Sequence, residues 1–490
     1  MKAAKRGNPA SRFKRFAFWL GLGIAAWLAS ILLTQAFYWL VPAKPSLAVL
    51  RLQEEASRRP VLTENGFRLA GLQAPAGWDP VAFGRCLYPD AEKLTETPTW
   101  DPAYRPSSRN EEEPGRIDCL KGQPALTLSP SITNAKAGPL WTLQDWVTLG
   151  EQAPTPELLE RARNIWAAGP RGLGIDLWSP SPDRRPLSKL AQWRIAHAVK
   201  LWQSGSQQAA LESWRASGEQ ALLATKGPFF ETILSANELS QMLLGMQMAV
   251  QSSAKIDEPT ALELLKVTAM ADQMSDHVRD AMISEWQMGE RHFRSLPQSL
   301  TAKLPENGTP DQARFRTAIE TLRDVVFDSV DTVNRFTAYF ELQRDRVGPL
   351  SNGDLPPLTK ISRTCEWMGN WAMLWCRPFE RNPLGRFLMG LKDPSFDEIG
   401  SFETYDSYDR YGNVIADLRN VAAAARLTIE VRSQGLQGEA LARFVAEAPE
   451  NMRDIFSKAP FTYDHGQRQL AIRLREKNTV LGEGSHTLSL

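Results

Sequence analysis

The longest apolar stretch of the chain lies near its start, from Phe16 to Val41, and contains no charged residue. A helix rises about 1.5 Å per residue, so about 20 apolar residues cross the hydrocarbon core of a bilayer. Trp19 lies near one end of the stretch, and Tyr38 and Trp39 lie at the other. Such rings favour the headgroup level. The pattern therefore predicts a transmembrane helix over 16–41 that contacts the lipid bilayer, with these three residues as interface anchors.

Charge on the two sides of this stretch predicts its orientation. Only two basic residues, Lys44 and Arg51, follow it closely, whereas six precede it: Lys2, Lys5, Arg6, Arg12, Lys14 and Arg15. Basic residues flank the cytoplasmic end of a span, so residues 1–15 are expected to form a cytoplasmic tail. The alternatives are a buried helix and a cleaved signal peptide, whose apolar region covers about 7–15 residues before a small-residue cleavage site.

Residues 42–140 have a different pattern, with frequent proline and glycine and short apolar runs. An amphipathic piece from Leu47 to Arg58 predicts a juxtamembrane stalk. The remainder is expected to be irregular and held by a disulfide, because Cys86 and Cys119 both lie in it.

The four cysteines form two sequence-local pairs, since Cys365 and Cys376 are the other two. In an exported chain they favour two disulfides, most simply 86–119 and 365–376, although four cysteines allow three connectivities. Each bond would stabilise the fold by about 2–4 kcal/mol. Residues 365 and 376 would lie about 16 Å apart on one straight helix, so pairing requires a bend. Buried free thiols are the alternative.

Residues 141–348 change to helical periodicity and predict an α-helical body. Apolar residues at helical spacing over 191–202 and again over 209–214 flank the sequence SGSQ, which predicts an antiparallel helix pair. Further helices are expected at 228–252, 259–273, 276–295 and 311–346, the last capped by Asp311 and ending before Gly348 and Pro349.

The C-terminal third divides into three predicted parts. Residues 349–412 are aromatic and loop-like, with Trp367, Trp371 and Trp375 as core residues or as a platform for a sugar or a partner. Residues 413–475 predict two helices, over 414–433 and from 441, and a β-hairpin over 460–474. Residues 476–490 are expected to be disordered. The fold class is therefore mainly α, with a small C-terminal α+β element.

Three segments resemble uncharacterised, single-pass, membrane-anchored bacterial envelope proteins. They are NGFRLAGLQAPAGWDPVAFGRC after the span, RNPLGRFL, and the ending PFTYD…QRQLAIRL. The resemblance implies the bacterial inner membrane and an exported, mostly helical body in the periplasm. It implies no activity.

Charge and motifs restrict the function. Lys plus Arg number 57 and Asp plus Glu 56, so no basic field for nucleic acid is expected. The five histidines are dispersed, and neither a metal site nor a cofactor is predicted. Ser252 and Lys255 fit the SxxK pattern of penicillin-recognising enzymes and are the candidate catalytic pair. However, Ser235-Ala236-Asn237 precedes this motif instead of following it, and no KTG sequence exists.

Two functions from different classes follow. The first is a membrane-anchored periplasmic scaffold or adaptor that binds other envelope proteins through helical surfaces. The alternative is an envelope hydrolase acting on peptidoglycan or protein, which would need Ser252 and Lys255 in a polar cleft.

Overall fold

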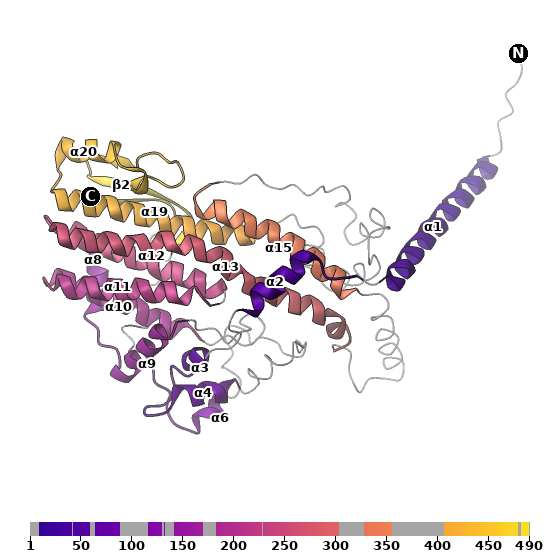
Figure 1. The fold of residues 1–490 in the computed structure, drawn as a ribbon, viewed down its shortest axis with the longest axis horizontal. Helices are drawn as coiled ribbons and strands as arrows, with labels where there is room; N and C mark the ends of the chain where they lie inside the picture. Colours follow the sequence, from indigo (N-terminus) through magenta and orange to yellow (C-terminus); the bar gives the residue numbers. More distant parts are fainter. Residues whose placement is uncertain are drawn as a thin grey trace, which may run out of the picture.

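The computed structural model describes residues 9–41, 43–58, 64–88, 116–129, 132, 142–169, 183–227, 229–302, 328–354, 406–478 and 482–489. Within these ranges the chain is mainly helical, with a small antiparallel sheet near the C-terminal end (Figure 1). The mainly α class predicted from the sequence is confirmed.

The described helices and strands carry the labels of Figure 1. In chain order they are α1 (Pro9–Leu40), α2 (Leu47–Ser57), α3 (Glu64–Ala70), α4 (Pro80–Leu87), α6 (Arg116–Leu120), α8 (Leu143–Gly150), α9 (Pro156–Ala167), α10 (Arg185–Gln203), α11 (Gln207–Ala224), α12 (Phe229–Gln251), α13 (Glu258–Ala302), α15 (Ser329–Ser351), α19 (Asp406–Gln434), α20 (Gly438–Ala446), a 3₁₀ turn (Glu450–Met452), β1 (Thr462–Asp464), β2 (Gln469–Asn478) and β3 (Gly482–Ser489).

Helix α1 projects away from the other helices (Figure 1). Its segment Ala17–Phe37 is the one part of the described chain that is long and apolar enough, in a helix, to cross a membrane. Large apolar side chains cover its surface, and Trp19 and Leu33 expose 66% and 70% of their area. A contiguous apolar surface of this size is unfavourable in water.

The long helices α12, α13, α15 and α19 pack against one another and form the centre of the body. Their apolar faces join one buried core that continues from α2 to β2. Trp146, Trp214 and Trp286 are fully buried in it. Burial of such apolar surface stabilises the fold by roughly 25 cal/mol per Å².

The predicted antiparallel pair is present as α10 and α11. Trp202 and Trp214 pack across the pair with ring centroids 5.6 Å apart. Gly205 lies in the connecting turn with a φ of +86°, a conformation that glycine adopts without steric cost. The turn at SGSQ therefore depends on the positive φ of Gly205.

Two predicted helix ends in the body are wrong. Helix α13 is continuous from Glu258 to Ala302, although separate helices were predicted over 259–273 and 276–295. Met274 and Val278 are fully buried one turn apart, so the core-facing stripe continues through the polar residues of this stretch. Helix α15 runs through Gly348 and Pro349 to Ser351.

The last turn of α15 has local support. Pro349 lacks an N–H, but its carbonyl accepts the N–H groups of Asn352 and Asp354 at 3.0 and 3.1 Å. Asp328 caps the start of the helix through the Asp331 N–H, at 3.0 Å. The predicted start at Asp311 lies outside the described residues.

Helix α2, which lies in the segment predicted as a juxtamembrane stalk, packs on the body. Val49, Leu52 and Ala56 lie on one face of the helix and are buried against α13 and α15. The Ser46 hydroxyl accepts the Val49 N–H at 3.2 Å and caps the first turn. The amphipathic pattern of this segment reflects burial of its apolar face.

The connection that precedes α2 is fixed by one side chain on α15. The amide nitrogen of Asn334 donates to the Lys44 carbonyl at 2.9 Å. Its amide oxygen accepts the Ser46 N–H at 2.8 Å. The two bonds hold the backbone on both sides of Pro45 and leave the amide no freedom to turn.

Charged groups hold the middle of α2 to the same helices. Arg344 on α15, only 12% exposed, contacts Glu55 at 3.0 Å and Asp280 at 3.8 Å. Gln53 donates to Glu290 on α13 at 2.7 Å. The partly buried Arg344–Glu55 ion pair is screened less by salt than an exposed pair.

The segment expected to be irregular contains the short helices α3, α4 and α6. Asp79 caps α4 by accepting the Val81 and Ala82 N–H groups, and Pro80 at the first helical position is compatible with that start. Cys86 and Cys119 form a disulfide, with Cα atoms 5.9 Å apart. These helices were not predicted, because each is short and the surrounding sequence is rich in proline.

Helices α19 and α20 precede the predicted hairpin, which is present as β1 and β2. Tyr463 pairs with Leu470, and β3 pairs with the other edge of β2. The prediction of a disordered tail is therefore wrong for 476–478 and 482–489, the part of the tail that the structure describes. The glycine-containing sequence of β3 has little strand propensity, and main-chain pairing with β2 forms the strand.

We predict that Leu52→Ala lowers the free energy of unfolding by about 2–5 kcal/mol, because Leu52 lies on the inner face of α2 and is fully buried. Leu262→Ala is the control, since this leucine on α13 is 53% exposed; the expected change is below about 0.5 kcal/mol. Denaturant titration of the detergent-solubilised chain measures both. Equal losses in the two variants would contradict the docking of α2.

Candidate functional site

The predicted catalytic pair lies at an exposed end of α12. Ser252 and Lys255 are both exposed. The Ser252 hydroxyl donates to the Ala249 carbonyl and accepts a hydrogen bond from Gln203, both at 2.6 Å. Its proton is thus engaged by the backbone, and this placement supplies the serine with no base.

The other predicted residues are distributed as follows. Trp19 is exposed on α1, and Tyr38 and Trp39 lie in the last turns of the same helix, where their side chains are outside the described part. Cys365 and Cys376, with the three tryptophans between them, also lie outside it.

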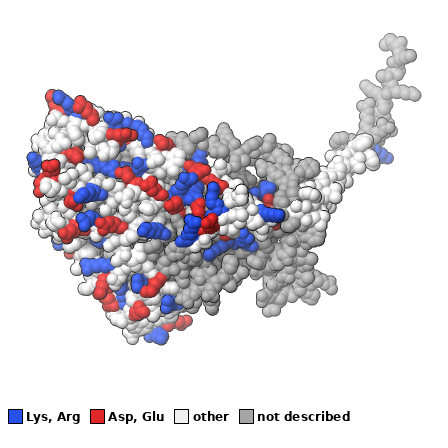
Figure 2. All heavy atoms as spheres, viewed as in Figure 1, with Lys and Arg blue, Asp and Glu red and all other residues white. Residues whose placement is uncertain are grey.

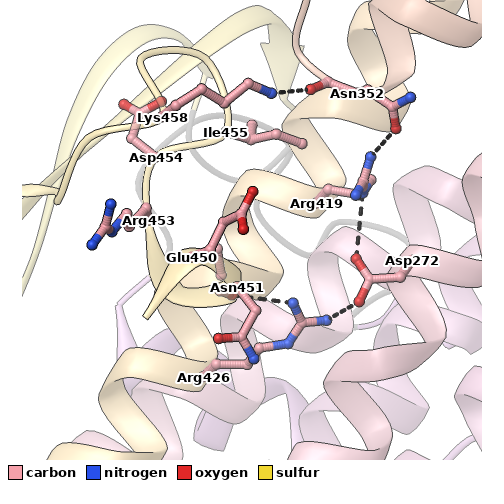
Figure 3. Close-up of a pocket in the computed structure, with 11 residues that line it drawn as sticks. Asp272, Asn352, Arg419, Arg426, Glu450, Asn451, Arg453, Asp454, Ile455 and Lys458 are labelled. Atoms are coloured by element: carbon pink, nitrogen blue, oxygen red, sulfur yellow. Dashed lines mark hydrogen bonds and ion pairs between the residues drawn. The ribbon is translucent and has the colours of Figure 1, made fainter. Parts of the chain in front are cut away.

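A polar pocket lies where the loop after α20 covers α13, α15 and α19 (Figure 3). Its volume is about 530 Å³, within the size range of small-molecule sites. The described lining includes three carboxylates, Asp272, Glu450 and Asp454, and the cations Arg419, Arg426, Arg453 and Lys458.

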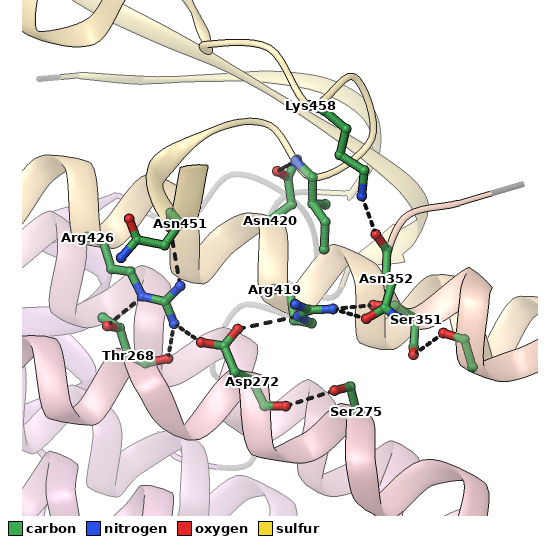
Figure 4. Close-up of polar contacts among 12 residues, drawn as sticks. Thr268, Asp272, Ser275, Ser351, Asn352, Arg419, Asn420, Arg426, Asn451 and Lys458 are labelled. Carbon is green, nitrogen blue, oxygen red and sulfur yellow. Dashed lines mark hydrogen bonds and ion pairs between the residues drawn. The ribbon is translucent and has the colours of Figure 1, made fainter. Parts of the chain in front are cut away.

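Helix α19 supplies the centre of the pocket. Arg419, Ala423 and Arg426 lie at positions i, i+4 and i+7, so they share one helix face. Asp272 on α13 faces them and bridges the two arginines: it contacts Arg419 Nε at 3.3 Å and Arg426 Nη2 at 2.5 Å (Figure 4).

Arg426 is buried, and each of its three guanidinium nitrogens has a partner. Its side chain is 8% exposed. Besides Asp272, its donors reach the hydroxyl and carbonyl of Thr268 at 3.1 and 3.0 Å and the Asn451 carbonyl at 3.2 Å. A buried guanidinium needs such acceptors because an unpaired charge is costly in the interior. Arg426 therefore ties α13, α19 and the covering loop together.

Arg419 performs the same role toward the end of α15. It donates to the Ser351 carbonyl at 3.2 Å and to the side-chain oxygen of Asn352. The backbone carbonyl of Asn352 in turn accepts from Lys458 at 2.6 Å. One chain of contacts thus crosses the pocket from helix to loop.

The covering loop is held from below by Asn420. Its side-chain oxygen accepts the Ile455 N–H at 3.0 Å, and its nitrogen donates to the Arg473 carbonyl on β2 at 2.9 Å. A single buried amide on α19 therefore positions both the loop and the sheet.

Arg475 closes the side of the loop nearest the sheet. Its guanidinium lies over the Phe456 ring, 4.1 Å from the centroid, and donates to the Gly353 carbonyl at 2.8 Å. Burial lowers the pKa of Arg475, and nearby carboxylates, with Asp417 the strongest, oppose that shift. An arginine stays charged at neutral pH even so.

Free binding capacity remains at the rim of the pocket. The Glu450 carboxylate and the terminal nitrogens of Arg453 have no partner among the residues that the structure describes. The rim therefore offers donors and acceptors to a small polar ligand. No group of three or more His, Cys, Asp or Glu residues in the described ranges could hold a metal ion.

Most of this pocket could not be predicted from the sequence, because Asp272 lies 147 and 154 positions before its two arginine partners. The spacing of Arg419 and Arg426 on one helix face was the one local signal.

Comparison of the chain with protein-family models, curated proteins and solved structures gives no match. The resemblance to membrane-anchored bacterial proteins stays a prediction, and the site is interpreted from its own geometry.

We predict that Asp272→Asn lowers the free energy of unfolding by about 1 kcal/mol or more, because it leaves the buried Arg426 without its anionic partner. Asp272 is 45% exposed, so solvent screening keeps the loss toward the lower end of about 1–3 kcal/mol. Asp276→Asn, at an exposed position one turn further along α13, is the control. Thermal or denaturant unfolding measures both, and a Asp272→Asn variant as stable as the control would contradict a structural role of the pair.

Proposed function

We propose that the chain is a single-pass protein of the bacterial inner membrane, with its N-terminus in the cytoplasm and its body in the periplasm. There it serves as a scaffold or adaptor for other envelope proteins. The observation that carries the proposal is the continuity from the exposed apolar helix α1 to the clamped helix α2. This arrangement keeps a folded body at a fixed place beside the membrane.

Charge and redox chemistry support the orientation. The six basic residues before the span favour the cytoplasmic side for the N-terminus. The Cys86–Cys119 disulfide suits an oxidising compartment on the other side.

The surface of the body supports protein partners. On the face shown in Figure 2, basic and acidic residues are interspersed over the described helices. Nucleic-acid binding uses a clustered basic face, whereas mixed charge suits complementary contacts with another protein. The Arg344–Glu55 ion pair and the Gln53–Glu290 hydrogen bond hold α2 to α15 and α13 and keep those helical surfaces in a constant relation to the anchor.

The hydrolase alternative gains no support from geometry. It requires Ser252 and Lys255 in a polar cleft, and both lie at the exposed end of α12 with the Ser252 proton bonded to Ala249.

The orientation is tested with single cysteines at the two ends of the anchor. In spheroplasts, a membrane-impermeant maleimide should label Ser57→Cys, and it should label Ala3→Cys only after lysis. The unsubstituted chain gives the background from native cysteines. Labelling of Ala3→Cys before lysis would reverse the proposed topology.

The scaffold role is tested by in-cell crosslinking and mass spectrometry. The full chain is compared with a variant in which residues 16–41 are replaced by an unrelated membrane span of equal length. We expect the same envelope proteins to crosslink to the body of both, because the partners bind helical surfaces outside the membrane. If no protein crosslinks to the body in either form, the scaffold proposal is refuted.

A further inference from the structure

The start of α2 is restrained to the place where α1 ends. Helix α1 ends at Leu40 and α2 begins at Leu47. At about 3.5 Å per residue, the connection between them spans roughly 25 Å at most. Asn334 also fixes the connection on both sides of Pro45. If α1 crosses a bilayer, the first turn of α2 lies close to the bilayer surface.

The outer face of that first turn is apolar. A helix advances about 100° per residue, so Leu47 and Leu50 lie opposite the buried Leu52 and Ala56. Leu47 is 86% exposed and Leu50 is 49% exposed. One turn further along the same face, the side chain of Arg51 is 60% exposed.

Exposed leucines of this kind are concentrated near the anchor. Beyond α1 and its last residues, the large apolar residues exposed in the described chain are these two and three others on separate helices, Leu223, Leu262 and Leu342. Leu40 and Val41, 72% and 48% exposed, continue the apolar surface from α1 toward α2.

We infer that the first turn of α2 lies in the interfacial layer of the bilayer, with Leu47 and Leu50 at the boundary between headgroups and acyl chains. The inference rests on the proposed membrane anchoring and adds a second lipid contact to it. An interfacial helix buries its apolar face about 5–10 Å into this layer. Lys44 is exposed beside the turn, and its long side chain reaches the headgroup phosphates while its stem stays apolar.

This contact would orient the whole body. The face of α2 opposite the lipid is the one that carries Val49, Leu52 and Ala56 into the core. Because α13 and α15 pack on that face, the lipid contact sets their rotation about the anchor as well as their distance from the membrane.

The test measures the depth of a fluorescent label in the full chain. Leu28→Cys, Leu47→Cys, Leu50→Cys and Ser57→Cys are each labelled with nitrobenzoxadiazole under non-reducing conditions. Each is then reconstituted into phosphatidylcholine–phosphatidylglycerol vesicles with or without doxyl-labelled lipid. We expect doxyl lipid to lower the emission at 28, 47 and 50 by about twofold and at 57 by less than about a tenth. The unsubstituted chain corrects for native cysteines.

The outcomes distinguish the proposed membrane anchoring by α1 from the proposed interfacial contact of α2. No quenching at Leu28 shows that α1 is not in the bilayer, and the proposed function fails. Quenching at Leu28 without quenching at Leu47 and Leu50 keeps the anchor and overturns the interfacial contact. In that case, protection of the Leu47 label from aqueous iodide would show that protein covers the turn. Thermal unfolding of each labelled variant confirms that the fold is kept.

Discussion

Burial of the inner face of α2 is the interaction on which the arrangement of this protein depends. Without it, the exposed apolar helix α1 would be tethered to the body by a flexible connection. Val49 and Leu52 supply the apolar contact, and Asn334 fixes the backbone that leads into it. In the proposed topology, the same contacts keep the body close to the membrane and determine which helices face it.

Much of the helical pattern could be predicted from the sequence, because apolar residues facing a core recur at a helical period. The prediction of α12 differs from the structure by one residue at each end. Errors arose where long-range packing outweighed local composition. Two helices were predicted with a break at 274–275. However, Met274 and Val278 are both buried on the same helix face, and α13 continues through this stretch. Strand β3 depends on pairing with β2, which has no local signal.

The polar pocket could not be predicted from the sequence for a related reason. Asp272 and Arg426 belong to helices far apart in the chain, and only the packing of α13 against α19 brings their charges together. A buried guanidinium on α19 with acceptors from α13 and from the covering loop makes that packing specific, since a shifted helix would leave the charge unpaired. The contacts that line the pocket are therefore also contacts that hold α13 against α19.

Helix α13 sets a length scale for the molecule. Its 45 residues extend over roughly 67 Å at helical rise, and its C-terminal end points toward the side of the body where α1 attaches (Figure 1). One unbroken helix thus sets the distance between the side of the body where α1 attaches and the opposite end. In the proposed topology, that end, near Glu258, lies well beyond the headgroup layer while the other end stays beside the bilayer. Under that proposal, a protein that bound at Glu258 would be held within a fixed distance of the membrane.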